Sequence, residues 1–369
     1  MRQLGRTDIR VGAPLPWSCY DSSGHLLLRK GVCIAFEHQI DRLLNEGLFV
    51  EDAERAGIQI GNAAETEGVF ERLTALAWGL RTLFNSLLSP APAPDTEERL
   101  RARARKILEA CAADPNAAIA AVHLDFQNPY MLAHHAHSAV ICALLGRRMG
   151  MSDEELIPVI CAALSFDLGL LELAYLEKQE GPLDSDQSES VRAHVDRTLR
   201  YLERAGVKDR VWLTVVRQHH ERWNGSGYPQ GLAGEDICLG ARLLAIADSY
   251  TAMVRGRAFR APRTAMEAQG EMFKQIGILY DESVCKAFIK EVGLYPPGSI
   301  VRLANGETSV VKERNRDGKP IVMSAYDAQG MPLMAPRRRD TTVNGFAVLR
   351  PLPQSECRSA AVIIRRLWL

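Results

Sequence analysis

Apolar residues recur three to four positions apart between residues 66 and 88; they are Val69, Leu73, Leu76, Leu80 and Leu83. This spacing predicts an amphipathic helix. The Pro-rich stretch Ser89–Asp95 ends the pattern, and the glutamates that follow it favour the start of a second helix. From residue 96 to about residue 292 the helical periodicity is almost continuous, so the middle of the chain is expected to be a helical domain.

The two ends of the chain have a different pattern. Residues 1–65 combine short β-type runs, Val11–Trp17 and His25–Leu28, with a helical stretch at Glu37–Gly47. After residue 295 apolar and polar residues alternate, and turn-forming pairs separate the alternating runs; these pairs are Asn305-Gly306, Asp317-Gly318 and Gln329-Gly330. We therefore expect a small α/β domain at the N-terminus and a β appendage at the C-terminus.

The predicted fold class is mainly α, with these two smaller parts. We expect five segments, namely an N-terminal accessory domain (1–65), a helical linker (66–118), a helical domain (119–295), a β extension (296–353) and a tail (354–369). The helix over residues 66–88 has two options, packing on its own core or pairing with a second copy of the chain as a homodimer. The sequence leaves both open.

The amino-acid composition and the net charge exclude several classes of protein. The 369 residues are 47% hydrophobic and 24% charged, which excludes a disordered or collagen-like chain. Lys+Arg and Asp+Glu are equal at 45 each, so no overall charge favours a nucleic-acid polymer or an anionic membrane. We expect no membrane span, because no apolar run reaches about 18 residues. Eight cysteines without a CxxC pair, and a start without a signal-peptide pattern, indicate a cytoplasmic protein.

Histidines gather in the helical domain, where seven of the nine lie between positions 123 and 220. A helical bundle can direct such side chains to one interior point, where imidazoles and carboxylates bind Zn, Fe or Mn. Asp167 and Asp248 lie in apolar helical stretches, where a buried carboxylate needs a cation or hydrogen-bond donors. Each residue alone has a simpler explanation, since a single helical histidine such as His134 is more often hydrogen-bonded or exposed than a ligand.

One continuous string makes the pattern specific. Residues 219–229, HHERWNGSGYP, resemble the HHExxDGxGYP signature of the HD-GYP family, a branch of the HD-domain metal-dependent phosphohydrolases. Other family landmarks follow in the expected order; they are His137-Ser138 (the leading HS pair), Asp167-Leu168-Gly169 (the HDxGK position), His194, Asp248-Ser249-Tyr250 and Arg257-Ala258-Phe259-Arg260. The resemblance covers roughly residues 120–350.

This resemblance implies an HD-domain helical bundle that hydrolyses the bacterial second messenger cyclic di-GMP with a metal-activated water. It implies Asp167 as the catalytic, metal-bridging carboxylate and Fe or Mn as the cofactor. The implied metal ligands are His137, Asp167, His194, His219, His220 and Asp248. The implied substrate-binding residues are Gly225, Gly227, Tyr228, Arg257 and Arg260.

The sequence departs from the family at positions that serve catalysis. The HD histidine is Phe166, the HDxGK lysine is Leu170, and the glutamate that some members carry before the HS pair is Ala133. A phenyl ring cannot coordinate a metal, and leucine cannot neutralise a phosphate. The signature aspartate is Asn224, which keeps an oxygen acceptor.

By resemblance, Asp167, His194 and His219 would still hold one metal. The neighbouring site would keep His137, Asp167 and Asp248 but lack the imidazole of the HD histidine, so we expect it to be weak. Two interpretations follow. The chain is a slow metal-dependent phosphodiesterase for cyclic di-GMP, or it is a non-catalytic sensor or adaptor that binds the dinucleotide or protein partners. A nucleotidase for another phosphoester would not account for the GYP loop, the loop after His220 that contains Gly227-Tyr228-Pro229.

Overall fold

The computed structural model describes residues 68–353 except 126–127, 180, 183 and 257–260, as well as residues 366–368. Of the first 67 residues it describes 2–9, 15, 17–20, 26–28, 40, 44 and 49–50. The chain forms two compact units. One runs from Val69 to Pro296, and the other combines residues 1–68 with residues 297–369.

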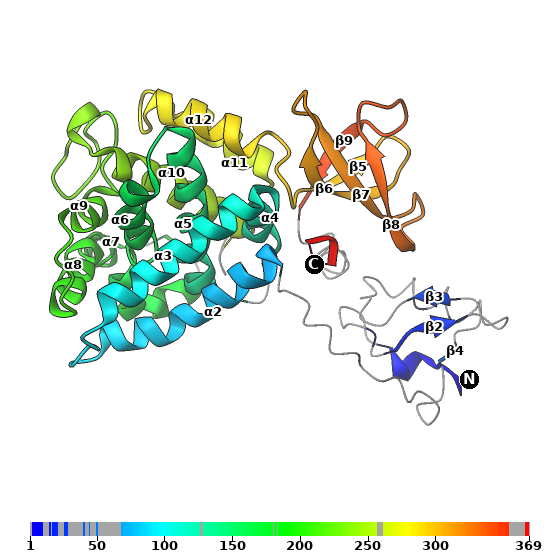
Figure 1. The fold of residues 1–369 in the computed structure, drawn as a ribbon, viewed down its shortest axis with the longest axis horizontal. Coiled ribbons are helices and arrows are strands. Elements are labelled where there is room, and N and C mark those ends of the chain that lie inside the picture. Colours follow the sequence, from blue (N-terminus) through cyan, green and yellow to red (C-terminus); the bar gives the residue numbers. More distant parts are fainter. Residues whose placement is uncertain are drawn as a thin grey trace. The chain divides into compact units, whose positions relative to one another are not determined.

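The first unit is helical (Figure 1). Its elements are α2 (Val69–Leu88), α3 (Thr96–Ala113), α4 (Pro115–Leu124), α5 (Tyr130–Arg148), α6 (Asp153–Ala163), η2 (Leu168–Lys178), α7 (Ser185–Arg192), α8 (His194–Arg204), α9 (Arg210–Gln218), η3 (Gly234–Asp236), α10 (Leu239–Arg255), α11 (Ala265–Phe273) and α12 (Glu282–Val292). Helix α5 is the centre of the bundle, because it packs against α2, α3, α6 and α10 and is buried on every face from Leu132 to Gly146. The predicted mainly helical domain is confirmed.

Polar residues at the helix starts define several boundaries. Ser152 caps α6 and forms a reciprocal pair with Glu155, and Thr264 does the same with Glu267 at the start of α11. These caps satisfy backbone N–H groups that have no partner inside the helix. The proline-rich stretch that was expected to separate two helices does lie between α2 and α3.

Helix α2 packs on the bundle rather than standing apart from it. It contacts α3, α4 and α5, and Leu80, Leu83 and Leu87 are fully buried. The apolar stripe of this helix is therefore covered by the chain itself. The five-segment division, and a homodimer, remain predictions.

One segment, Asp153–Leu173, is long and apolar enough to cross a membrane when judged by length and composition alone. In the helical unit 72% of its apolar window is buried by other parts of the chain. This burial is typical of a core helix.

The second unit contains two antiparallel sheets. Strands β5 (Ile300–Leu303), β6 (Thr308–Arg314), β7 (Pro320–Tyr326), β8 (Pro332–Asp340) and β9 (Val348–Leu352) form a sheet of order β8-β7-β6-β5-β9. The predicted turns connect these strands, because Asn305-Gly306 joins β5 to β6, Asp317-Gly318 joins β6 to β7 and Gln329-Gly330 joins β7 to β8. The C-terminal β appendage is confirmed.

The N-terminal sheet is smaller, with strands β1 (Arg2–Gln3), β2 (Cys19–Tyr20), β3 (Leu26–Leu28) and β4 (Phe49–Val50) in the order β1-β4-β2-β3. The predicted strand at His25–Leu28 corresponds to β3. Most of the predicted strand at residues 11–17 and most of the helix at residues 37–47 lie outside the described residues.

Candidate metal centre

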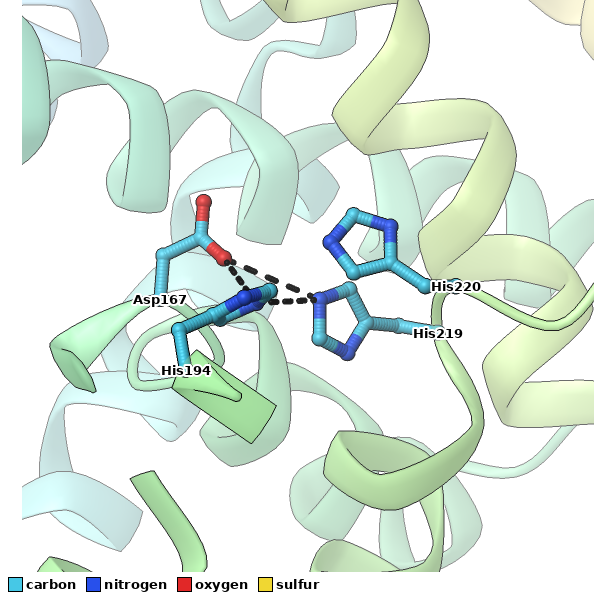
Figure 2. Close-up of side chains that lie close together, drawn as sticks. All are labelled: Asp167, His194, His219 and His220. Carbon is cyan, nitrogen blue, oxygen red and sulfur yellow. Dashed lines mark hydrogen bonds and ion pairs between the residues drawn. The ribbon is translucent and has the colours of Figure 1, made fainter. Parts of the chain in front are cut away.

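Four polar side chains from three places in the sequence meet inside the helical unit (Figure 2). Asp167 lies in the turn between α6 and η2, His194 is the first residue of α8, and His219 and His220 directly follow α9. Each offers one ligand atom, and these atoms lie within 4.8 Å of one another. The structure thus brings together four of the residues that the sequence predicted as metal ligands.

The hydrogen bonds of two histidines show which ring nitrogens face the centre of this cluster. The Nδ1 atom of His194 lies 2.5 Å from the carbonyl oxygen of Val191, and Nδ1 of His219 lies 2.7 Å from that of Val216. Because a carbonyl oxygen only accepts hydrogen bonds, each Nδ1 donates, and in the neutral ring each Nε2 presents a lone pair. Such backbone contacts orient metal-binding histidines.

Three acceptor atoms therefore face one another. The two Nε2 atoms are 3.5 Å apart, and Asp167 Oδ1 lies 3.1 Å from that of His194 and 3.7 Å from that of His219. Asp167 Oδ1 is buried and has no hydrogen-bond partner among the described residues. Lone pairs this close repel each other unless a proton or a metal cation lies among them. The donor set fits a divalent metal that prefers imidazole and carboxylate ligands.

Burial and the neighbouring side chains shift the pKa values of Asp167 and His194 in opposite directions. Burial disfavours the charged form of Asp167, but the adjacent imidazoles of His194 and His219 outweigh it and hold the pKa of Asp167 well below its usual value. Burial also disfavours protonated His194, but Asp167 raises the pKa of His194 overall. The carboxylate is thus ionised, as a metal ligand must be.

A second cluster shares Asp167 and adds His134 and Asp248. His134 Nε2 lies 3.1 Å from Asp248 Oδ1 and 3.9 Å from Asp167 Oδ2. The other ring nitrogen of His134 lies 3.1 Å from the hydroxyl of Thr251, which itself donates to the carbonyl oxygen of Ala247. Burial opposes ionisation of Asp248, but His134 outweighs this effect and lowers the pKa of Asp248 to about 2.

The structure corrects the expected role of His137. Its Nε2 lies 3.5 Å from Asp125 Oδ2, away from both clusters, and the Asp125 carboxylate also accepts hydrogen bonds from Asn128. His134, one helical turn earlier, is the α5 histidine that reaches Asp167 and Asp248. Helical spacing could not separate the two histidines, because residues three apart lie on the same side of a helix. Counted from His134, the expected glutamate position moves from Ala133 to Tyr130, which also offers no carboxylate.

Phe166 lies between the two clusters. Its side chain is fully buried, and its ring centroid is 5.0 Å from that of His135, 5.1 Å from that of His219 and 5.5 Å from that of His134. A phenyl ring among these imidazoles supplies no ligand and keeps water out of the space that it fills. The second cluster is left with one imidazole and two carboxylates.

His135 supports the centre without belonging to it. Its Nδ1 donates to the carbonyl oxygen of Met131, and its Nε2 accepts the backbone N–H of Asp167 at 3.4 Å. Burial lowers the pKa of His135 to about 4, so the ring is neutral, as this pair of contacts requires. The sequence did not predict this role. A histidine that accepts a hydrogen bond from a backbone N–H group leaves no recognisable pattern in the sequence.

The GYP loop is held by Glu221, whose buried carboxylate accepts the backbone N–H groups of Gln230 at 2.7 Å and Leu232 at 3.0 Å. A Cβ atom on Gly227 would lie 2.4 Å from Glu221 Cα, so only glycine fits there. The Tyr228 ring packs on His220 with centroids 4.7 Å apart and planes at 31°. Through Tyr228 the loop therefore contacts His220, one of the candidate metal ligands.

Of the remaining predicted site residues, the structure describes Gly225 but not the two arginines. Gly225, which belongs to this loop, adopts a φ of +78°, which favours glycine. Arg257 and Arg260 lie outside the described residues. Asn224, in place of the signature aspartate, accepts hydrogen bonds from the backbone N–H and hydroxyl of Ser226. It thus has a local role within the loop.

Comparison with known proteins finds a matching domain model and related sequences. The family model described as HD domain matches residues 119–284. A cyclic di-GMP phosphodiesterase of Pseudomonas aeruginosa is 34% identical over 205 residues, which cover 54% of this chain and 49% of that protein. A 3'3'-cGAMP-specific phosphodiesterase of Vibrio cholerae is 32% identical over 178 residues, covering 47% of this chain and 38% of the relative. The chain thus spans half or less of the length of these relatives.

A solved structure supports the same fold. An HD-GYP-type protein from Bdellovibrio bacteriovorus superposes with a TM-score of 0.52 at 14% identity, covering 78% of this chain and 98% of that one. At this identity the likeness concerns the fold. The residues that match the HD domain model lie within the helical unit. Residues 119–284 thus match the HD domain model, and the chain shares the fold of an HD-GYP-type protein.

Proposed function

We propose that this chain binds a cyclic dinucleotide, in the first place cyclic di-GMP, at one complete metal site, and that it hydrolyses the dinucleotide slowly. The observation that carries the proposal is the four-residue cluster of Asp167, His194, His219 and His220, next to the GYP loop. The nature of the ligand follows from the relatives in Pseudomonas aeruginosa and Vibrio cholerae, whose names both specify cyclic dinucleotides.

In this proposal each part of the site has one task. His194, His219, His220 and Asp167 would hold a divalent metal such as Fe or Mn, which supplies charge for the phosphate and lowers the pKa of water. Asp167 is also within reach of His134 and Asp248, so it is the carboxylate that a second metal would share. The loop residues Gly225, Gly227 and Tyr228 bring backbone and an aromatic ring toward the nucleotide.

Slow hydrolysis follows from Phe166 and Leu170. Phosphodiester hydrolysis in a two-metal site depends on both cations to stabilise the attacking and leaving oxygens. Here the second cluster has three candidate ligands, and a buried phenyl ring stands beside it. Loss of a ligand and of the lysine charge removes transition-state stabilisation but leaves the first site and the loop intact.

The second candidate function is a non-catalytic sensor or adaptor that signals by contact once the dinucleotide is bound. The observation that favours it is the buried Phe166 ring, which lies against imidazoles of both clusters. Protein partners and a cytoplasmic location remain predictions under both candidates.

One assay distinguishes the slow phosphodiesterase from the non-catalytic sensor. The purified protein is incubated with cyclic di-GMP and excess Mn²⁺, and the nucleotides are separated by chromatography. Linear product above the level of a His219→Ala control supports the enzyme. Unchanged dinucleotide supports the sensor, provided that the double variant Phe166→His, Leu170→Lys gains hydrolysis. No gain in a folded, metal-binding double variant would contradict our assignment of these two positions as the cause.

A further inference from the structure

Arg192 stands at the edge of the candidate metal centre. It is the last residue of α7, two positions before the ligand His194, and its side chain is exposed. Its guanidinium carbon lies 5.2 Å from the centroid of the Tyr228 ring. Since Tyr228 packs on His220, one chain of contacts connects Arg192 to the four-residue cluster.

The charge of Arg192 is not neutralised by the described part of the chain. No carboxylate of a described residue forms an ion pair with it, and among these residues its guanidinium lies over the Tyr228 ring. The neighbouring Arg197 differs, because its guanidinium donates to the carbonyl oxygens of Gly169 and Ser190 and faces Glu172. The Arg197 donors are thus used within the helical unit, whereas those of Arg192 form no hydrogen bond to the part of the chain that the structure describes.

A positive charge at the edge of the candidate metal centre would replace one that this chain lacks. The HDxGK lysine, which the family resemblance implied would neutralise the phosphate, is Leu170. A Cβ on the preceding Gly169 would lie 2.4 Å from the carbonyl oxygen of His194, so the start of η2 and the start of α8 are in direct contact. Leu170 and Arg192 are both within two residues of that contact. The lost lysine charge and Arg192 therefore belong to the same part of the site.

We propose that Arg192 is a substrate-binding residue that donates hydrogen bonds to a phosphodiester oxygen of the bound cyclic dinucleotide. The inference rests on the proposed function. A planar guanidinium fits two oxygens of a phosphate at once, and this pairing is stronger than an exposed cation–π contact. Arg192 leaves the Tyr228 ring for the phosphate when the nucleotide binds, and the ring face that it covered becomes available for stacking.

The test is equilibrium binding of fluorescently labelled cyclic di-GMP to the Mn²⁺-loaded full chain at fixed ionic strength. Arg192→Ala should weaken binding about 10- to 100-fold, the range for losing a hydrogen-bonded charge pair. Arg192→Lys should lose less, because the ammonium keeps the charge but not the paired donors. The control is Arg200→Ala, which removes an exposed arginine of α8 and should change the dissociation constant less than about twofold.

A parallel Mn²⁺ titration separates ligand contact from an indirect effect through His194. Arg192→Ala should bind Mn²⁺ as the wild type does. Equal loss of Mn²⁺ binding and nucleotide binding would overturn the phosphate contact and make Arg192 a positioning residue. Wild-type nucleotide affinity in Arg192→Ala would overturn the inference alone. If the wild type binds neither cyclic di-GMP nor 3'3'-cGAMP, the proposed function fails and the inference fails with it.

Discussion

Gly169 is the residue whose size most directly controls the position of a predicted metal ligand. A Cβ atom there would lie 2.4 Å from the carbonyl oxygen of His194, 2.9 Å from Arg197 Cβ and 3.0 Å from His194 Cα. Two of these three atoms belong to backbone, which cannot rotate away as a side chain can. Gly169→Ala must therefore shift the start of α8, and His194 with it.

The expected cost is at the upper end of the range for inserting a methyl group into a packed interior, about 2–3 kcal/mol. For a unit the size of residues 69–296 this lowers the melting temperature by about 5–10 °C. The displaced imidazole should weaken Mn²⁺ binding about 10- to 100-fold, as expected when the support of a ligand is disturbed.

Thermal unfolding followed by circular dichroism, together with an Mn²⁺ titration, measures both effects. The matched control is Gly270→Ala, at an exposed position in α11 where an added Cβ has no neighbour within 4 Å. Alanine favours the helix there, so stability should rise by up to about 1 kcal/mol. Wild-type stability and Mn²⁺ affinity in Gly169→Ala would refute the claim that this contact positions His194.

Three further predictions test other parts of the molecule. His134→Ala should abolish the weaker second Mn²⁺ equivalent in a calorimetric titration, whereas His137→Ala should leave metal binding intact; the reverse result would restore His137 as the ligand. Glu221→Gln replaces an acceptor of two backbone N–H groups by an amide, and should weaken cyclic di-GMP binding while Mn²⁺ affinity stays unchanged. Hydrogen bonding to Arg339 lowers the pKa of Glu307 from 4.5 to about 2, so this pair stabilises the β sheet fully above about pH 4.5 and its contribution is lost as the pH falls toward 2. Acid unfolding should show this loss, and a Glu307→Gln variant with the same acid dependence as the wild type would contradict it.

Much of the site could be predicted because it is encoded in a short, continuous signature. His219 and His220 begin the HHExxDGxGYP-like string, and Asp167 and His194 follow from their order relative to it. Their convergence needs only a helical bundle, which the periodicity also predicted. The turn pairs of the C-terminal sheet were predictable for a similar reason, since Asn-Gly and Asp-Gly are local signals.

The choice between His134 and His137 could not be made from the sequence. Both lie on the same side of α5, and the difference arises from the partners that face them, Asp125 for one and Asp248 for the other. Asp125 directly follows α4 and Asp248 lies in α10, so only tertiary packing decides. Arg192 shows the same limit, because its position over Tyr228 depends on how α7 and the GYP loop meet.

The central claim is that one complete metal site remains while a second is weakened beside Phe166. Electron paramagnetic resonance of free Mn²⁺ during a titration of the full chain tests it most directly. We predict one tight equivalent per chain, lost in His219→Ala, and a second tight equivalent only when Phe166→His restores the imidazole. Two equally tight equivalents in the wild type, or tight binding that survives His219→Ala, would contradict the account.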